Sequence, residues 1–392
     1  MEKKLGVIGA GTAGILTLTH FCTWLDNSWK VYSIHDPKKK ILGIGESTNG
    51  GFVNVLQLGL DFALGHAADM AFLDATLKFG SLFHNWRKED MLNPLLDGST
   101  AVHFNNFKFR EFAYGRLERL WPQKFRSLEG EVQKLKSLPD RVSAVIDGQE
   151  HEFDYVMDCM GFPDDFAGYT MSDCTPVNRC LIHNQKPPYE FKPYTDHIAH
   201  KHGWMFGVPL QSRKTYGYLF NDNMISKEAA LEDMRQELGV EKIEGGEYLF
   251  KCYYANSIIE GRICKNGNKA LFFEPLVANS IFLYIFTARQ FYDFITGTAD
   301  ETASNAAFVK MVQQMEDLIT YYYQGGSIHD TEFWRFATQK SKKRLETREP
   351  FHQLMATYRD LRSRGLLQHG PAYALAPHNW RLIDDGLGYH SF

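Results

Sequence analysis

The stretch that decides the fold is KKLGVIGAGTAGILTLTHFCTWL, residues 3–25. Residues 3–8 form a short apolar run typical of a buried strand, GAGTAG follows at 9–14, and residues 15–25 have the length and apolar spacing of a helix. KVYSI, residues 30–34, predicts a second strand. A glycine-rich turn that joins a strand to a helix, with another strand behind it, is the unit in which GxGxxG indicates dinucleotide binding.

The roles of the turn residues follow from that geometry. The first glycine permits a tight turn, the second lets a pyrophosphate approach the backbone, and the third lets the helix lie close to the sheet. The amides at the start of the helix meet the negative charge of the phosphate. The residue that holds the ribose normally ends the second strand, about 20 residues further on. His35 occupies that register and Asp36 follows it, so either residue could make the contact.

Two later segments favour a flavin over a nicotinamide. GEVQKLKSLPDRVSAVIDGQEHEFDYVMDCMGF, residues 130–162, predicts a strand, a hairpin with Asp147–Gly148 at its turn, and a buried strand. A three-stranded meander that returns to a strand ending in Asp-Cys-Met-Gly is typical of FAD-binding oxygenases. NGNKALFFEPL, residues 266–276, would bring another Gly-Asn to the same cofactor.

The composition excludes several classes of protein. A chain of 392 residues exceeds the size of one hydrophobic core, and 44% hydrophobic with 23% charged residues is ordinary for a globular protein. A net charge of −4 gives no basic excess for nucleic acid. We expect no signal peptide, and no run of about 18 apolar residues predicts a transmembrane helix. Six cysteines without CxxC or zinc spacing, and scattered histidines, predict reduced thiols, no metal site and a cytoplasmic protein.

The rest of the chain predicts a second lobe. Strands are expected around 203–221, an amphipathic helix near 226–238, and a mostly helical region over 283–364. The expected fold is α/β, an FAD-binding fold of the glutathione-reductase or p-hydroxybenzoate-hydroxylase type with an inserted, largely helical substrate lobe. We assign 1–60, 98–165 and 255–290 to a discontinuous FAD-binding module. Residues 61–97, 166–254 and 291–392 are assigned to the substrate-binding lobe.

DATLKFGSLFHNW, residues 74–86, places one lysine, Lys78, in an apolar run. Lysine is almost never fully buried without a partner, so the ordinary interpretation is a side chain that faces solvent. The interpretation changes once this segment is compared with a known family. Several segments, in order along most of the chain, resemble the flavin-dependent halogenases of the tryptophan-halogenase type.

The segments that carry this resemblance differ in specificity. The glycine turn is shared with many proteins, whereas ATLKFGSLFHNW resembles the family's lysine segment and GWMFGVPL, residues 203–210, resembles its Gly-Trp-x-Trp-x-Ile-Pro-Leu motif. GIGESTNG (43–50), DCMGF (158–162), FEPLVANSI (273–281) and TEFW (331–334) resemble further family segments. The resemblance implies a C–X bond-forming enzyme that needs FADH2, O2 and chloride, bromide or iodide. It also implies a separate flavin reductase and a small aromatic substrate.

The resemblance, together with the glycine turn, gives a set of candidate site residues. Lys78 is the expected catalytic residue, because a lysine amine can carry halogen as a haloamine or polarise hypohalous acid by hydrogen bonding. The expected cofactor residues are Gly9, Gly11, Thr12, Ala13, Gly14, His35, Asp36, Gly45, Glu46, Ser47, Thr48, Val132, Asp158, Gly161, Gly267, Asn268 and Ile281. The expected halide residues are Asn279 and Ser280, and those of the substrate pocket and tunnel are Phe83, Trp86, Trp204, Phe206 and Pro209.

The chain also departs from the family pattern. The family's Glu in Pro-Leu-Glu-Ser-Thr-Gly, which helps to take up the arenium proton, falls on Val277, and Thr-Gly becomes Asn279–Ser280. The missing carboxylate argues against free tryptophan and favours an activated phenol, pyrrole or indole. Two alternatives remain open: an FAD-dependent aromatic monooxygenase, and a catalytically inert flavin-binding protein. The sequence is compatible with a homo-oligomer.

Overall fold

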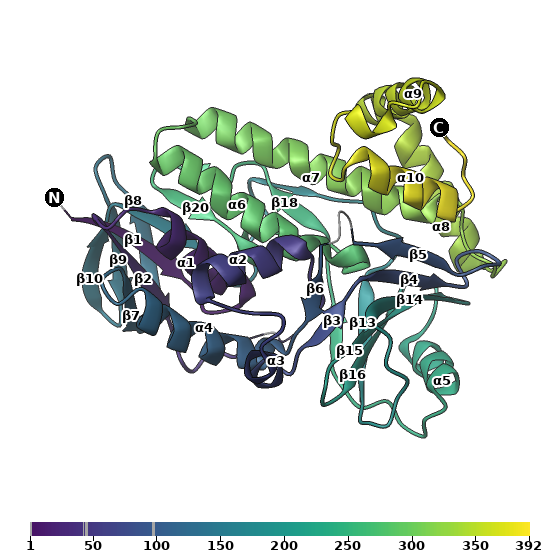
Figure 1. The fold of residues 1–392 in the computed structure, drawn as a ribbon, viewed down its shortest axis with the longest axis horizontal. Coiled ribbons are helices and arrows are strands. Elements are labelled where there is room, and N and C mark those ends of the chain that lie inside the picture. The colour runs from purple at the N-terminus through teal and green to yellow at the C-terminus, as the bar shows by residue number, and fades with distance from the viewer. Residues whose placement is uncertain (1, 42, 44–45, 96–98) are drawn as a thin grey trace. The chain divides into compact units, whose positions relative to one another are not determined.

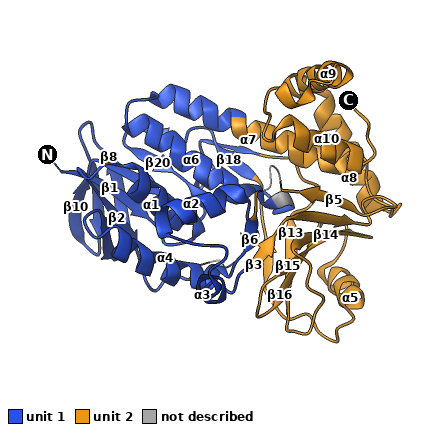
Figure 2. Ribbon diagram, viewed as in Figure 1, with its two compact units in different colours: residues 1–75, 101–171, 253–310 blue, residues 76–100, 172–252, 311–392 orange. Residues whose placement is uncertain are grey.

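Two units, each assembled from three stretches of chain, make up the computed structural model (Figures 1 and 2). The structure describes residues 2–41, 43, 46–95 and 99–392. Unit 1 comprises Met1–Ala75, Ala101–Met171 and Tyr253–Lys310, and unit 2 comprises Thr76–Thr100, Ser172–Cys252 and Met311–Phe392.

The largest sheet of unit 1 has six strands in the order β19-β20-β11-β1-β2-β7. Its strands are β1 (Lys3–Ile8), β2 (Trp29–His35), β7 (Phe125–Glu129), β11 (Tyr155–Asp158), β19 (Ile259–Glu260) and β20 (Ile263–Lys265). β1 pairs in parallel with both β2 and β11, so it is buried on both faces, as its continuous apolar run requires. A parallel β1–β2 pair needs a crossover connection, and helix α1 (Thr12–Trp24) supplies it.

The predicted hairpin of unit 1 is confirmed. β8 (Val132–Ser137), β9 (Val142–Ile146) and β10 (Gln149–Phe153) form an antiparallel three-stranded sheet. Both turn residues have positive φ, 46° at Asp147 and 79° at Gly148, which is the backbone that a two-residue hairpin needs. The inward residues of β9 pack with Ile8 and Ile34 of the large sheet, so the meander and the dinucleotide-binding strands share one core.

The remaining elements of unit 1 are short strands and the helices that flank its sheets. The strands are β6 (Ala101–His103), β12 (Tyr169–Met171), β18 (Tyr253–Ala255) and β21 (Leu271–Phe272). The helices are α2 (Gly50–Leu60), α3 (Ala67–Phe72), α4 (Asn106–Leu120), η1 (Gly267–Lys269), η2 (Leu276–Ala278) and α6 (Asn279–Ile295). Helix α7 (Glu301–Tyr323) begins in unit 1 and ends in unit 2.

Unit 2 contains a seven-stranded sheet of order β17-β13-β16-β15-β14-β4-β5, in which only the β14–β4 pair is parallel. Its strands are β4 (Gly80–His84), β5 (Met91–Pro94), β13 (Arg179–Gln185), β14 (Tyr194–His200), β15 (Gly203–Pro209), β16 (Lys214–Phe220) and β17 (Glu247–Leu249), and the short strand β3 (Thr76–Lys78) precedes β4. The strands expected around 203–221 are β15 and β16. The other strands of this sheet add to the mostly helical lobe that the sequence predicts.

The two faces of this sheet differ in character, because successive side chains of a strand point to opposite faces. One face packs Met205, Tyr216 and Tyr218 against helix α5 (Lys227–Leu238). On strands β4, β14 and β15 the other face carries Phe83, His197, Trp204 and Phe206, all buried. Lys78 belongs to the same unit as this aromatic face.

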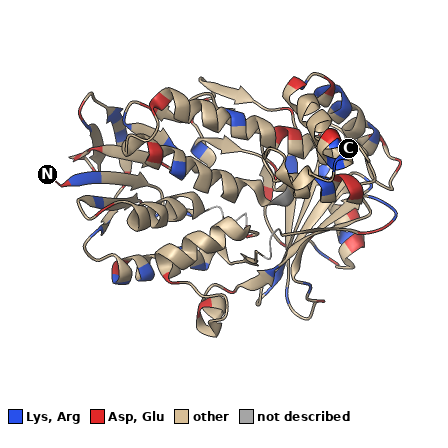
Figure 3. Ribbon diagram, turned by 45° about the horizontal axis from the view of Figure 1, so that its top comes forward, with Lys and Arg blue, Asp and Glu red and all other residues tan. Residues whose placement is uncertain are grey.

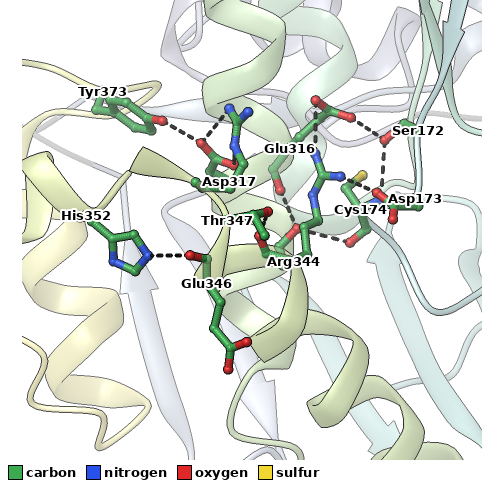
Figure 4. A network of polar contacts seen from close by, with 12 residues as sticks. Ser172, Asp173, Cys174, Glu316, Asp317, Arg344, Glu346, Thr347, His352 and Tyr373 are labelled. Atoms are coloured by element: carbon green, nitrogen blue, oxygen red, sulfur yellow. Dashed lines mark hydrogen bonds and ion pairs between the residues drawn. The ribbon is translucent and has the colours of Figure 1, made fainter. Parts of the chain in front are cut away.

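A buried polar network joins helices of unit 2 (Figure 4). Glu316, on α7, accepts a hydrogen bond from Ser172 and pairs with Arg344 at 3.2 Å. Asp317, which is fully buried, accepts two hydrogen bonds from Arg348 at 2.7 and 3.0 Å and one from the Tyr373 hydroxyl at 2.5 Å. The remaining helices are α8 (Glu332–Glu346), α9 (Glu349–Ser363), η3 (Leu367–His369) and α10 (Pro377–Gly386).

The charged residues of both units are interspersed, with Lys and Arg beside Asp and Glu along many helices (Figure 3). None of the helices described is long and apolar enough to cross a membrane.

Candidate active site

The glycine turn has the geometry that a pyrophosphate requires. Gly9 has φ +100°, and a Cβ there would lie 2.8 Å from the Cys159 carbonyl oxygen. A Cβ on Gly14 would lie 1.9 Å from the Gly9 carbonyl oxygen, so only glycine lets α1 pack this closely against β1. Gly11 differs, because a Cβ there meets nothing within 4 Å. Gly11 is the N-cap of α1, and it has no side chain that could accept hydrogen bonds from the first amides of the helix. These amides and the open space beside Gly11 fit a bound phosphate.

The neighbouring residues of the turn have separate tasks. The Thr12 hydroxyl donates to Asn106 Oδ1 at 2.7 Å and so fixes the start of α1 to α4. Gly267 has φ +63°, and a Cβ on this residue would lie only 2.7 Å from the Cβ of Ala13. The predicted contacts at 9–14 and at 267 therefore lie side by side in unit 1.

Two residues at the end of β2, His35 and Asp36, could each contact the ribose. His35 is buried, and its Nδ1 lies 3.3 Å from the Tyr114 hydroxyl. Burial is the main cause that lowers the pKa of His35, so its ring is neutral at pH 7. Asp36 follows the strand directly and accepts from the Lys38 amide at 2.9 Å. A neutral imidazole and a carboxylate can each accept a hydrogen bond from a ribose hydroxyl.

The other expected flavin residues fall in the segments around 46–48, 158–161 and 267–268, at the start of β8 and in α6, all in unit 1. Glu46 is buried, Ser47 forms a bridge with His103, and the Thr48 hydroxyl donates to the Val102 carbonyl at 2.6 Å. These contacts hold the 46–48 loop against β6. Gly45, expected in the same loop, lies outside the described residues.

The loops after β11 and β20 lie next to each other and contain further expected flavin residues. Asp158 ends β11 beside β1, and burial raises the pKa of its carboxyl, which also accepts from the Met160 amide at 2.9 Å. Gly161 has φ +56°. The Asn266 amide donates to the Asp158 carbonyl at 2.8 Å, which brings the 266–268 loop alongside.

Asn268 and Val132 complete this set, with Ile281 on α6. Asn268 Oδ1 accepts from the Tyr284 hydroxyl at 2.9 Å, and its carbonyl accepts from Tyr253 at 2.5 Å. Val132 opens β8 and Ile281 is buried in the first turn of α6. Asn266, which the sequence argument passed over, is fully buried and donates through Nδ2 to Thr17 and to the Tyr284 carbonyl.

The expected halide residues open helix α6. Its N-cap is Ala278, in the left-handed region at φ +56°, and no side chain caps the helix. The first amides of a helix attract anions when no cap satisfies them. Asn279 is 5% exposed, and its Nδ2 has no hydrogen-bond partner among the residues that the structure describes. A buried amide donor without a partner, at an uncapped helix start, fits a small anion.

Lys78 is not a surface lysine. It is 3% exposed at the end of β3, and burial lowers the pKa of its amine from 10.5 to about 7. The backbone around it is fixed, because the Thr76 hydroxyl donates to the Pro209 carbonyl at 2.6 Å and the Phe79 amide donates to the Pro193 carbonyl at 2.8 Å. The ordinary interpretation of a solvent-facing side chain is wrong for this residue.

Four of the five expected tunnel residues form one packed aromatic group in unit 2, and the fifth, Pro209, ends β15. The rings of Trp86 and Trp204 lie 6.5 Å apart, Phe83 packs edge-on to Trp86 at 5.5 Å, and Trp204 lies 6.4 Å from Phe206. Phe206 covers Gly217, where any Cβ would collide with the ring at 2.1 Å. Trp204 is fully buried, and its Nε1 has no hydrogen-bond partner within the described chain.

Three aromatic residues of this group were missed by the sequence argument. The Tyr322 ring stacks on Phe83 at 5.2 Å, Tyr323 packs on Trp86 at 5.6 Å, and His197 stacks on Phe83 at 4.6 Å. Tyr322 and Tyr323 lie in a helical segment far along the chain, so only the tertiary fold brings them here. Trp334, from the TEFW segment, packs on Trp86 at 5.3 Å.

The HIAHKHG run at 197–203 does not gather its histidines. His197 and His200 are three residues apart on β14, so their side chains point to opposite faces. His197 stacks with Trp204 at 5.4 Å, whereas His200 lies 5.4 Å from Tyr218 on the α5 face.

The family model described as tryptophan halogenase matches residues 4–139 and 94–389, and the chain belongs to this family. Tryptophan 6-halogenase ThaL of Streptomyces albogriseolus is 20% identical over 478 residues, covering 100% of this chain and 85% of ThaL. The uncharacterized protein y4xG of Sinorhizobium fredii is 22% identical over 413 residues, covering 85% of this chain and 79% of y4xG.

Solved structures share the fold. The flavin-dependent halogenase Xcc4156 of Xanthomonas campestris superposes with a TM-score of 0.83 at 17% identity, covering 99% of this chain and 89% of Xcc4156. The flavin-dependent halogenase BrvH of Brevundimonas sp. BAL3 gives 0.78 at 20% identity, covering 99% and 90%.

The predictions of family, fold and enzyme class are confirmed by these comparisons. The chain is an enzyme of the flavin-dependent halogenase class, an oxidoreductase. Membership in this class implies a flavin and a halide ion.

Proposed function

We propose that this enzyme uses FADH2 and O2 to make hypohalous acid and delivers the halogen through Lys78 to an electron-rich aromatic substrate other than free tryptophan. The observation that carries the proposal is the buried Lys78 amine, whose pKa burial lowers to about 7, in the same unit as the aromatic group. Desolvating a lysine without a catalytic use for it would only destabilise the fold.

The residues around the glycine turn would hold the flavin. The open side of Gly11 and the uncapped start of α1 would take the pyrophosphate, and His35 or Asp36 would take the ribose. Reduced flavin together with O2 supplies the two oxidising equivalents that convert halide to hypohalous acid. A separate flavin reductase would deliver the reduced cofactor.

The start of α6 would hold the halide. The amides of Asn279 and Ser280 and the Nδ2 of Asn279 are the donors, and the helix start supplies a partial positive charge. Backbone N–H groups are present whatever side chain the residue has, so the change from Thr-Gly to Asn-Ser keeps the backbone donors of the anion site.

Lys78 has both forms that halogen transfer requires. At a pKa of about 7, neutral amine and ammonium are present together at neutral pH. The neutral amine attacks the halogen of hypohalous acid: the N–X bond forms, the O–X bond breaks, and the amine proton leaves with hydroxide as water. The aromatic carbon then attacks the halogen, the N–X electrons return to nitrogen, and the arene proton restores the amine. The ammonium form can alternatively polarise hypohalous acid by hydrogen bonding.

The aromatic group formed by Phe83, Trp86, Trp204 and Phe206 would keep water from this chemistry. Hypohalous acid is a diffusible oxidant, and a dry pocket confines its reaction to one acceptor. The loss of the family's glutamate at Val277, whose side chain lies outside the described part of the structure, favours a substrate that needs little help to lose its proton.

The test combines the protein with FAD, NADH, a generic flavin reductase and a panel of phenols, pyrroles and indoles, with chloride, bromide and iodide in parallel. Mass spectrometry is expected to find halogenated product with wild type and none with Lys78→Ala. The variant should still reoxidise reduced flavin and release hypohalous acid to a thiol trap.

The rival functions give different results in the same assay. Hydroxylated product without halide would establish the monooxygenase, and it would not depend on Lys78. Flavin binding with no product from any substrate, and identical behaviour of wild type and Lys78→Ala, would establish the inert flavin-binding protein.

A further inference from the structure

His84 lies between two carboxylates of unit 2. Its Nδ1 is 2.8 Å from Asp90 Oδ2, and its Nε2 is 3.2 Å from Asp196 Oδ1. A carboxylate can only accept hydrogen bonds, and a neutral imidazole has a single N–H. Both contacts can therefore be hydrogen bonds only when the ring carries two hydrogens and a positive charge. The hydrogen bond to Asp196 is the main cause that raises the pKa of His84 above its ordinary value of 6.5.

Asp196 is held from its other side as well. It is buried, and the Lys214 amine donates to its Oδ2 at 2.8 Å. This ion pair spans β15, because Lys214 lies on β16 and Asp196 on β14. A Cβ on Gly207 of β15 would lie 3.0 Å from Lys214 Cε and 3.1 Å from Asp196 Oδ2, so the glycine leaves room for the pair. Charges of alternating sign thus form a row from Lys214 through Asp196 and His84 to Asp90.

This row lines a cavity of about 450 Å³ on the face of the sheet opposite to the aromatic group. The side chain of His84 is 22% exposed, so water reaches the ring and its charge follows the pH of the solvent. The other charged residues that line the cavity are Glu190, Lys192 and Glu237. Glu190 pairs with Lys192 at 3.4 Å, and Glu237 lies 3.8 Å from His200 Nδ1. These groups have partners of their own, whereas Asp90 and Asp196 contact His84 directly.

The two contacts of His84 fix one loop at its base. His84 is the last residue of β4, and Asp90 directly precedes β5, so the contact between them closes the β4–β5 loop, residues 85–90. The contact with Asp196 attaches the same point to β14. The loop contains Trp86, which is fully buried in the aromatic group and donates through Nε1 to the His197 carbonyl at 3.0 Å.

We propose that His84 is a positioning residue for Trp86: in its charged form it bridges Asp90 and Asp196 and so holds the β4–β5 loop with the Trp86 ring in the aromatic group. When the ring loses a proton, one carboxylate faces a lone pair. Asp196 is buried and retains its hydrogen bond, whereas the Asp90 side chain is 54% exposed and turns to water. The base of the loop therefore opens as pH rises. The inference rests on the proposed function only in taking the aromatic group as the wall of the halogenation pocket.

The first experiment titrates the histidine rings of the full-length chain by nitrogen-15 NMR, with the His84 signals assigned from their loss in His84→Gln. At pH 6 both ring nitrogens of His84 should carry hydrogen, and its pKa should lie above 6.5. Asp90→Asn should lower that pKa by about one pH unit, because it removes an opposite charge in direct contact. The matched control is Glu190→Gln, another carboxylate of the same cavity, which should leave the pKa of His84 unchanged. A pKa at or below 6.5, or an equal displacement in both variants, would overturn the proposal.

The second experiment measures hydrogen exchange of the 84–91 peptide by mass spectrometry at pH 6 and pH 9, with each rate divided by its intrinsic value at that pH. In wild type and in Glu190→Gln the protection should fall about 10-fold between the two, as expected for the loss of one hydrogen bond to a charged group. His84→Arg should keep its protection at both pH values, because the guanidinium stays charged and the cavity has room for it. Asp90→Asn should show the low protection already at pH 6. Equal protection of wild type at both pH values would show that His84 does not hold this loop.

Turnover gives a third, independent readout. Product formation should decline on the alkaline side with the pKa of His84, and His84→Arg should extend activity to higher pH. An alkaline decline that is the same in His84→Arg and wild type would remove the positioning role. Because titration and exchange need no halogenation, a raised His84 pKa with pH-dependent protection but no halogenated product would reject the proposed function and retain the bridge between Asp90 and Asp196.

Discussion

Replacing Lys78 by methionine should stabilise the protein while it abolishes halogen transfer. The folded state holds this amine at a pKa of about 7 against 10.5 for an exposed lysine, and burial is the cause. Methionine has a similar length and no charge to desolvate. The substitution therefore removes a cost without opening a large cavity.

The magnitude follows from proton linkage. Each pH unit of difference in pKa corresponds to about 1.4 kcal/mol, so the difference between 10.5 and about 7 gives a cost of about 5 kcal/mol at low pH. The folded-state pKa lies below the unfolded value, so the unfolded chain binds the proton more tightly and the cost is fully present below pH 7. It falls as pH rises and vanishes above about 10.5. We expect Lys78→Met to gain about 4 kcal/mol at pH 7 and about 2 kcal/mol at pH 9.

The assay is guanidinium chloride unfolding, followed by tryptophan fluorescence at pH 6, 7, 9 and 10.5. The control is Lys214→Met, another buried lysine of unit 2, whose pKa is raised through its pairing with Asp196. Its removal leaves a buried carboxylate with one partner fewer, and it should lower the free energy of unfolding by about 3 kcal/mol. The two substitutions should thus have opposite signs at pH 7.

One result would refute the reasoning. If Lys78→Met lowered the free energy of unfolding, or raised it equally at pH 6 and pH 10.5, Lys78 would not be a desolvated amine in solution. The proposed chemistry would then lack its reactive nitrogen.

Three further substitutions test other parts of the structure. Gly14→Ala should prevent stable folding of unit 1, whereas Gly11→Ala should fold and weaken FAD binding at least 10-fold in a fluorescence titration, since only the Gly11 site has room for a Cβ. Asn279→Ala should raise the halide KM about 10-fold with kcat nearly unchanged, because one hydrogen bond to a charged group contributes about 1.5 kcal/mol. Arg348→Met should lower the free energy of unfolding by about 3–5 kcal/mol by leaving the buried carboxylate of Asp317 without its ion pair (Figure 4).

The dinucleotide-binding strands could be predicted from the sequence because their signals are local. A strand, a glycine turn and a helix occupy consecutive residues. The dipeptide Asp147–Gly148 alone predicts the turn between β9 and β10. Each of these choices is decided by backbone geometry and short-range burial. The comparisons confirm the family and the fold, while the assignment of individual site residues stays a prediction.

The aromatic group of unit 2 could not be predicted in the same way. His197 and Tyr322 both stack on Phe83, although more than a hundred residues separate each of the three from the next along the chain. No periodicity within one segment indicates such a contact, because it depends on how β4, β14 and α7 pack. In the sequence, His197 is one of several polar residues in the HIAHKHG run. The pairing of β14 with β4 and β15 shows that its side chain lies on the aromatic face of the sheet.

The burial of Lys78 shows why chemistry, and not packing, explains this region. A fold selected only for stability would place a methionine or leucine at the end of β3, since either residue fills the space without a charge. The chain instead buries an amine, in the same unit as the buried side chains of Phe83, Trp204 and His197. Local violations of the rules for stable folds are expected where a protein performs its reaction. If Lys78→Met raises the free energy of unfolding and abolishes halogen transfer, the protein keeps the buried amine for its reactivity although it lowers stability.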